Sequence, residues 1–174
     1  MNKVFHLKNQ LSIQRKQRIA TFTSIIRIIM AYGINLNLPG GWKTEKDSYI
    51  DESGEEITHL EACLAGTEGR DNDALIDIYA GSMPEGETAE DQAFANYAET
   101  VGFDEDDEER PISSFKFNGK TAWGFEAVTE EDYPMRFIAQ EVRKGLLVII
   151  VCCASSEEKL SEVSVLIERN LRVK

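Results

Sequence analysis

The alternation of apolar and polar positions predicts three strands in the first half of the chain. INLNLP (34–39) places an apolar residue at every second position, which is typical of a half-buried strand. The segments 57–66 (ITHLEACLAG) and 74–81 (ALIDIYAG) alternate in the same way. The first of these also fits a helix, but the turn-like GTEGRDND that follows it favours a strand. The polar segment 44–56 (TEKDSYIDESGEE) is predicted to be a loop or a frayed edge.

Two other segments carry the 3.6-residue period of amphipathic helices. The first, TAEDQAFANYAETVG, begins with Thr88 three residues before Asp91, which is the spacing of a capping box. The second, SSEEKLSEVSVLIERNL, begins with Ser155 three residues before Glu158. The expected apolar stripes are Phe94, Tyr97, Ala98 and Val101 in the first helix, and Leu160, Val163, Ile167 and Leu171 in the second.

The second half of the chain between these helices is rich in predicted strands. Asn118-Gly119 separates PISSFKF from KTAWGFEAV, and this dipeptide favours the type I′ turn of a β-hairpin. MRFIAQEV follows, and then LLVIIVCCAS, whose nearly continuous apolar run predicts a central strand. Because short turns join these four strands, we expect an antiparallel meander. The chain is therefore predicted to be a single α+β domain, with helices covering an antiparallel sheet.

The charge of the chain is distributed unevenly. Residues 1–44 contain seven Lys/Arg and no Asp or Glu, whereas residues 45–174 contain the other 12 Lys/Arg and all 31 Asp/Glu, a net charge of −19. We therefore expect a folded domain at 34–174, preceded by a basic tail or helix at 1–33 that need not be part of the native fold. Three interpretations of 1–33 stay open: a loose tail or start-site artefact upstream of Met30, a docked helix, and a targeting segment.

Few residues suggest catalytic or metal chemistry. The chain has two histidines, His6 and His59, and three cysteines without paired spacing, so neither a zinc site nor a disulfide framework is expected. We expect Cys63, Cys152 and Cys153 to be buried thiols that act as small hydrophobic side chains. His59 lies two residues from Glu61, on the same strand face, so a proton-transferring pair is conceivable, although a surface contact is the simpler interpretation.

Two further motifs do not meet the requirements of a ligand site. Pro39-Gly40-Gly41-Trp42 lacks the spacing of a phosphate-binding loop, and we expect a turn with Trp42 anchored in the core. The acidic run 103–109 places aspartates like the first ligands of a calcium-binding EF-hand, but the glycine needed at loop position six is missing. No metal and no cofactor is therefore predicted.

Residues 34–174 resemble the PsbP/DcrB-like superfamily, which includes the Ran-binding nuclear import factor. The resemblance is carried by NLPGGWK, by Gly86-Glu87-Thr88 leading into the first helix, by the hairpin FKFNGKTAWGFEA, by the apolar strand LLVIIVCC and by a closing helix from Ser155. It implies an antiparallel sheet between helices, an α/β/α sandwich, and a non-enzymatic binding role. The lipobox cysteine of the lipoprotein members is missing, and no partner carries over from the family.

The sequence therefore predicts a non-catalytic protein-binding or adaptor domain with an acidic surface for a basic partner. Strong negative charge disfavours nucleic acid as a partner, and no segment has the roughly 20 apolar residues of a membrane span. A cytoplasmic location is expected unless 1–33 is a targeting segment. The alternatives are a small-molecule or cation-binding domain, and an enzyme that uses His59 in a pocket with an acid in reach. The expected partner-binding residues are Asp104, Glu105, Asp106, Asp107, Glu108 and Glu109, with Glu130, Glu131 and Asp132 as a second cluster.

Overall fold

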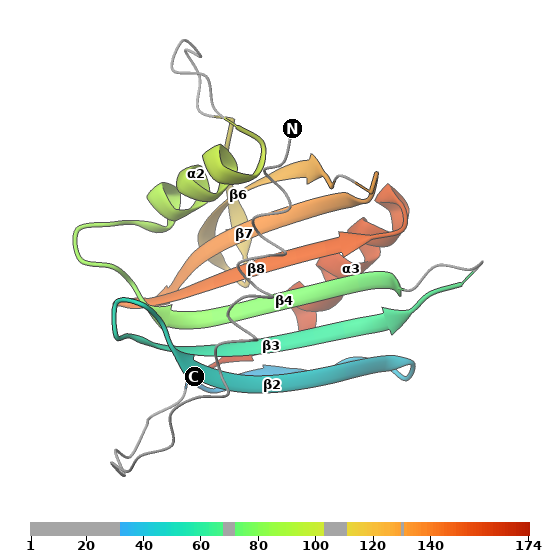
Figure 1. Ribbon diagram of the computed structural model, residues 1–174, viewed down its shortest axis with the longest axis horizontal. Helices are drawn as coiled ribbons and strands as arrows, with labels where there is room; N and C mark the ends of the chain where they lie inside the picture. Colours follow the sequence, from blue (N-terminus) through green and yellow to red (C-terminus); the bar gives the residue numbers. More distant parts are fainter. Residues whose placement is uncertain (1–31, 68–71, 103–110, 130) are drawn as a thin grey trace.

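The structure, a computed structural model, describes residues 32–67, 72–102, 111–129 and 131–174. Seven strands form one sheet in the order β2-β3-β4-β8-β7-β6-β5, and every neighbouring pair is antiparallel (Figure 1). Their bounds are β2 Trp42–Ile50, β3 Glu56–Ala65, β4 Asn72–Ser82, β5 Ser113–Phe117, β6 Lys120–Val128, β7 Pro134–Arg143 and β8 Leu146–Ala154.

The predicted meander is confirmed, because β5, β6, β7 and β8 are consecutive in the chain and adjacent in the sheet. The apolar strand β8 lies at the centre of the seven, as expected from its composition. Asn118 and Gly119 form the β5–β6 turn with φ values of 50° and 75°, which is the positive φ that a two-residue hairpin turn needs.

The segment 44–56, which we expected to be a loop or a frayed edge, contains most of strand β2. This strand pairs with β3 from Trp42↔Leu64 to Ile50↔Glu56, and the loop expectation was therefore wrong over most of its length. The reason is its position, since an edge strand borders solvent on one side and tolerates charged residues on both faces. Trp42 packs partly buried against the core, as predicted.

The first predicted strand exists but lies outside the main sheet. Strand β1 (Ile34–Leu36) pairs with β9 (Leu171–Val173), a short strand that follows the last helix. Gly33 and Lys174 extend this pairing through two backbone hydrogen bonds of 3.2 and 2.9 Å. The buried side chains of this ribbon belong to the same core as the sheet.

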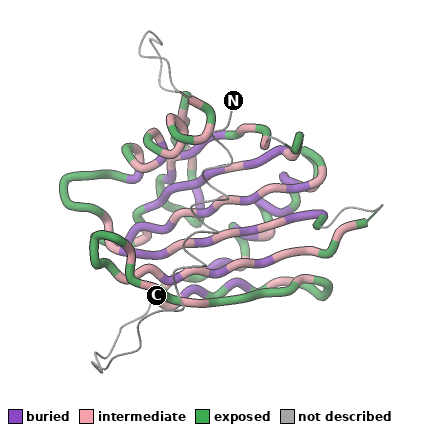
Figure 2. Tube along the Cα trace, in the orientation of Figure 1, coloured by how far each residue is buried: buried purple, intermediate pink, exposed green. Residues whose placement is uncertain are grey.

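One helix lies on each face of the sheet. Helix α2 (Ala89–Thr100) packs mainly on β6 and β7, and α3 (Glu157–Asn170) packs on β8, β4 and β7. Phe137 belongs to the cluster under α2, whereas its neighbour Ile138 belongs to the larger cluster under α3, so the two clusters lie on opposite faces. Buried and partly buried positions alternate along the central strands accordingly (Figure 2).

The α+β class is confirmed, but the helices do not form a layer on each side as the expected α/β/α sandwich requires. A seven-stranded sheet dominates the described chain, and each face carries one helix that spans only some of its strands. On the face of α2, strands β2, β3 and β4 lie beyond the strands that this helix mainly contacts (Figure 1). No helix of the described residues is both long enough and apolar enough to cross a bilayer.

The helix caps show how local the sequence signals are. Thr88 and Asp91 form the predicted capping box. In α3 the cap is Ser156, whose side chain accepts a hydrogen bond from the Lys159 backbone N–H, and the predicted Ser155 cap was wrong by one residue. The Ser155 N–H instead donates to the Asp73 carbonyl at 2.9 Å, which keeps Ser155 tied to β4.

The apolar stripe was predicted more accurately for α3 than for α2. Leu160, Val163 and Ile167 of α3 are buried as predicted. In α2 the buried residues are Ala89 and Ala93, with Tyr97 beside the core, whereas Val101 at the helix end is 50% exposed.

Candidate functional site

The candidate site is the face of strands β2, β3 and β4 that lies on the same side of the sheet as α2. Its side chains alternate along each strand with those that point toward the core under α3. The antiparallel registers align two rows across the three strands: Glu45, Glu61 and Asp77 in one, and Asp47, His59 and Tyr79 in the next. We call these six residues the acidic face.

His59 lies between two carboxylates of the acidic face. Its Nε2 is 2.8 Å from Oδ1 of Asp77, and its Nδ1 is 3.3 Å from Oδ1 of Asp47. The side chains of His59 and Asp77 are each 14% exposed, whereas that of Asp47 is 40% exposed. A neutral imidazole has one N–H, so both contacts are hydrogen bonds only when the ring carries both protons.

Tyr79 forms the floor under the histidine. The two rings are stacked, with centroids 4.5 Å apart and planes inclined by 10°. Burial, and after it the negative charge of Asp77, raises the pKa of the Tyr79 hydroxyl well above its ordinary value. Within the described part of the chain this hydroxyl has no hydrogen-bond partner. The phenol is therefore held in its neutral form, and the ring serves to position His59.

Glu45, Glu61 and Asp77 place three carboxylates opposite one another on neighbouring strands. Glu45 is the Cα partner of Glu61, and Glu61 is the partner of Asp77. Like charges directly opposite on a sheet are destabilising. The strands hold these side chains in fixed positions, so the acidic face offers a preformed site for cationic groups.

The sequence found one member of this site and missed its partners. His59 and Glu61 share a face, as predicted, but the carboxylates that contact the ring are Asp47 and Asp77 from the two neighbouring strands. The available signal was the polar half of the alternation in ALIDIYAG and in WKTEKDSYI. Register between strands is not visible in one segment, so the contact itself could not be predicted.

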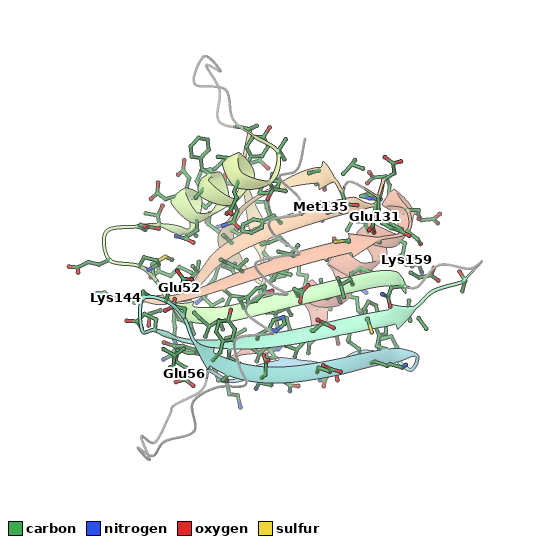
Figure 3. The ribbon with its side chains drawn as sticks, in the orientation of Figure 1. Glu52, Glu56, Glu131, Met135, Lys144 and Lys159 are labelled. Atoms are coloured by element: carbon green, nitrogen blue, oxygen red, sulfur yellow. The ribbon has the colours of Figure 1, made fainter. Side chains whose placement is uncertain are left out.

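Only two of the nine predicted partner-binding residues, Glu131 and Asp132, lie within the described part of the chain. Asp104, Glu105, Asp106, Asp107, Glu108, Glu109 and Glu130 lie outside the described residues. Glu131 and Asp132 are exposed in the β6–β7 turn. Glu131 lies at one end of the strands and Lys144 lies at the other (Figure 3). Asp132 has a φ of 61°, and its N–H donates to the Thr129 carbonyl at 3.0 Å. Three strands separate β6 from β3, so this turn is not part of the acidic face.

The remaining features that could carry chemistry are the three cysteines and a cavity. Cys63, Cys152 and Cys153 are free thiols, and Cys152 is buried, as predicted. Its burial raises the pKa of the Cys152 thiol to about 11. Among the described residues no group of three His, Cys, Asp or Glu side chains is arranged to hold a metal ion. A cavity of about 600 Å³ lies under α3 on the opposite face of the sheet, and His59 does not line it.

Comparison with known proteins gives little further information. No protein-family model matches the chain, and no curated protein matches it. Among solved structures, the extracellular domain of PknH from Mycobacterium tuberculosis aligns with 80% of this chain and 84% of its own length, at 14% identity and a TM-score of 0.28. A likeness this weak supports no statement about fold or function.

Proposed function

We propose that this chain is a non-catalytic protein-binding domain that holds a basic segment of a partner protein against the acidic face. The observation that carries the proposal is the row of Glu45, Glu61 and Asp77 across three strands, next to Asp47 and His59. A lysine or arginine of the partner forms charge-assisted hydrogen bonds with carboxylates of this face. The rigid strands fix the spacing of the acids before binding, which lowers the entropic cost of association.

Two further features support this proposal. The chain has a formal net charge of −12, which accelerates the encounter with a basic partner. The resemblance to the PsbP/DcrB-like superfamily, whose members are mostly non-enzymatic binders, belongs to the same proposal. The binding residues move, in this proposal, from the predicted acidic run 104–109 to the acidic face.

The test is the binding of a fluorescent eight-residue peptide of alternating arginine and serine, followed by polarisation at low and physiological salt. We expect Glu45→Lys to weaken binding at least fivefold, because it places a positive charge in the row. The matched control is Glu99→Lys at the exposed end of α2, which changes the net charge equally but lies outside the acidic face. Equal weakening by both variants would show that net charge alone attracts the peptide, and the proposal would then be wrong.

A further inference from the structure

A groove lies between α3 and the β5 end of the sheet, on the face opposite the acidic face. Helix α3 packs on β8, β4 and β7, and its outer side leaves a cavity of about 600 Å³ above β5, β6 and β7. This volume is within the range of ligand-binding sites. The floor includes Phe115, Phe117 and Ile138, and the α3 wall includes Ser161 and Val165.

The floor of the groove is partly apolar side chain and partly bare backbone, with Glu126 and Arg136 as its charged part. Phe125 and Phe137 stack on each other on the face of α2, with centroids 5.1 Å apart, so they line the groove through their main chains. Gly124 adds no side chain between them, and a Cβ there would overlap the Phe137 carbonyl oxygen. On the α3 wall, Val165 is 42% exposed and adds an apolar side chain to the groove.

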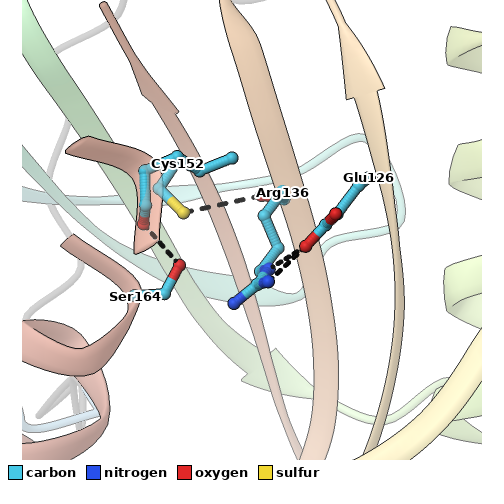
Figure 4. Close-up of polar contacts among 5 residues, drawn as sticks. Glu126, Arg136, Cys152 and Ser164 are labelled. Carbon is cyan, nitrogen blue, oxygen red and sulfur yellow. Dashed lines mark hydrogen bonds and ion pairs between the residues drawn. The ribbon is translucent and has the colours of Figure 1, made fainter. Parts of the chain in front are cut away.

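Three of the polar side chains that line the groove have partners within the domain. Arg136 pairs with Glu126 through Nε at 2.9 Å, and also through Nη2 (Figure 4). The Ser164 hydroxyl donates to the Leu160 carbonyl at 2.8 Å. The charges of this pair cancel, and so do those of Lys116 and Glu168, which also line the groove, so the lining has no net charge that would favour a charged occupant.

Beside the groove, strand β5 forms one edge of the sheet. The two-residue turn makes Phe117 and Lys120 a hydrogen-bonded pair, so Phe117, Phe115 and Ser113 bond to β6. The N–H and C=O groups of Ser114 and Lys116 therefore point away from β6. Within the described ranges no strand pairs with this side of β5. The outer edge of β5 can thus accept another strand.

The charge of this edge differs from that of the rest of the chain. Residues 111–125 contain Lys116 and Lys120 but no Asp or Glu, in a chain with a net charge of −12. Lys116 lies on the strand face opposite Phe115, with its Nζ 3.1 Å from Oγ1 of Thr121. An added strand therefore meets an apolar groove on one face and a lysine on the other.

We propose that the outer edge of β5 and the groove bind an extended peptide of a partner protein as an eighth strand, with apolar and acidic side chains in alternation. The side-chain period of two directs the apolar residues into the groove over Phe115 and Val165. The acidic residues then face Lys116. Backbone hydrogen bonds to Ser114 and Lys116 supply affinity, and the groove supplies specificity, as in other cases of strand addition.

The test uses the full chain and a fluorescent seven-residue peptide with valine at odd and glutamate at even positions. Ser114→Pro removes one outward N–H without touching the β5–β6 ladder, and Ser114→Thr is its matched control. Val165→Glu places a charge in the groove. We expect Ser114→Pro and Val165→Glu each to weaken binding at least tenfold, Ser114→Thr to change it less than twofold, and the peptide to slow hydrogen exchange at the Ser114 and Lys116 amides.

Three results would overturn the proposal. A peptide of the same composition with its valines in one block should not bind, and equal binding would indicate unspecific apolar contact. Unchanged affinity in Ser114→Pro would show that no strand is added, even if Val165→Glu weakens binding. Absence of exchange protection at Ser114 and Lys116 would exclude the edge. Since Glu45 lies on the other face, failure here leaves the test of the acidic face unaffected.

Discussion

The contact between His59 and Asp77 is predicted to couple the two side chains strongly, whereas the contact between His59 and Asp47 is predicted to couple them weakly. Both contacts involve the same imidazole ring, and both join neighbouring strands. They differ in distance, 2.8 Å against 3.3 Å, and in the exposure of the carboxylate, 14% against 40%. A double-mutant cycle on each pair therefore compares two ion pairs inside one protein.

The magnitudes follow from burial. Two unit charges 4 Å apart attract by about 4 kcal/mol at an effective dielectric of 20, and by about 1 kcal/mol in water. Desolvation offsets part of the larger value, and hydrogen bonds to charged groups contribute about 1.5–3 kcal/mol in mutational series. We expect a coupling of about 2 kcal/mol for His59–Asp77. For the more exposed Asp47 we expect about 0.5 kcal/mol, which is typical of a surface pair.

The assay is urea unfolding at pH 6 of His59→Gln, Asp77→Asn, Asp47→Asn and the two double variants. The loss of stacking on Tyr79 is common to all variants that lack His59, so it cancels from each cycle. Equal coupling in the two cycles, or a value under 0.5 kcal/mol for Asp77, would refute this account of the acidic face.

Three further predictions concern stability. Above about pH 9 the unfolded Cys152 thiol ionises before the folded one, whose pKa is about 11, so unfolding free energy should fall by up to about 3 kcal/mol toward pH 11, and by less in Cys152→Ala. Gly124→Ala should cost about 3 kcal/mol in urea unfolding, because the new Cβ overlaps the Phe137 carbonyl, whereas Gly40→Ala, with open space around it, should change stability by under about 1 kcal/mol. Slight burial acts to raise the pKa of Asp51, but hydrogen bonds within its turn outweigh this and lower it below 3.8. Its contribution is therefore complete above about pH 4 and lost as pH falls through the lowered pKa, so the Tm difference from Asp51→Asn should shrink toward pH 2.

The parts of the fold that the sequence predicted correctly are those decided within one segment. Alternation in 57–65 and 74–81 is a property of single strands, and so is the apolar run of β8. The Asn118-Gly119 turn and the Thr88 cap depend on residues at most three positions apart. Each of these features is determined by local backbone geometry, so the sequence pattern was sufficient.

The features that the sequence did not predict depend on neighbours in space. Strand β2 has too many charged residues to show an apolar period, and its strand conformation comes from pairing with β3. His59 meets Asp47 and Asp77 only because two registers place them on either side of it. The acids of Asp104–Glu109 are adjacent in sequence and can be identified without any register; they lie outside the described residues, so that prediction stays open.

The two edges of the sheet differ in a way that bears on both proposals. Strand β2 carries four charged residues, Lys43, Glu45, Lys46 and Asp47, on both of its faces, and such edges resist the addition of another strand. Strand β5 carries one, Lys116. If selection acted only against aggregation, both edges would need similar protection. Of the β2 charges, Glu45 and Asp47 belong to the acidic face, whereas the nearly uncharged edge of β5 borders the groove. The two proposals therefore use opposite edges of the sheet, so a basic segment on one edge would leave the other edge open to an added strand.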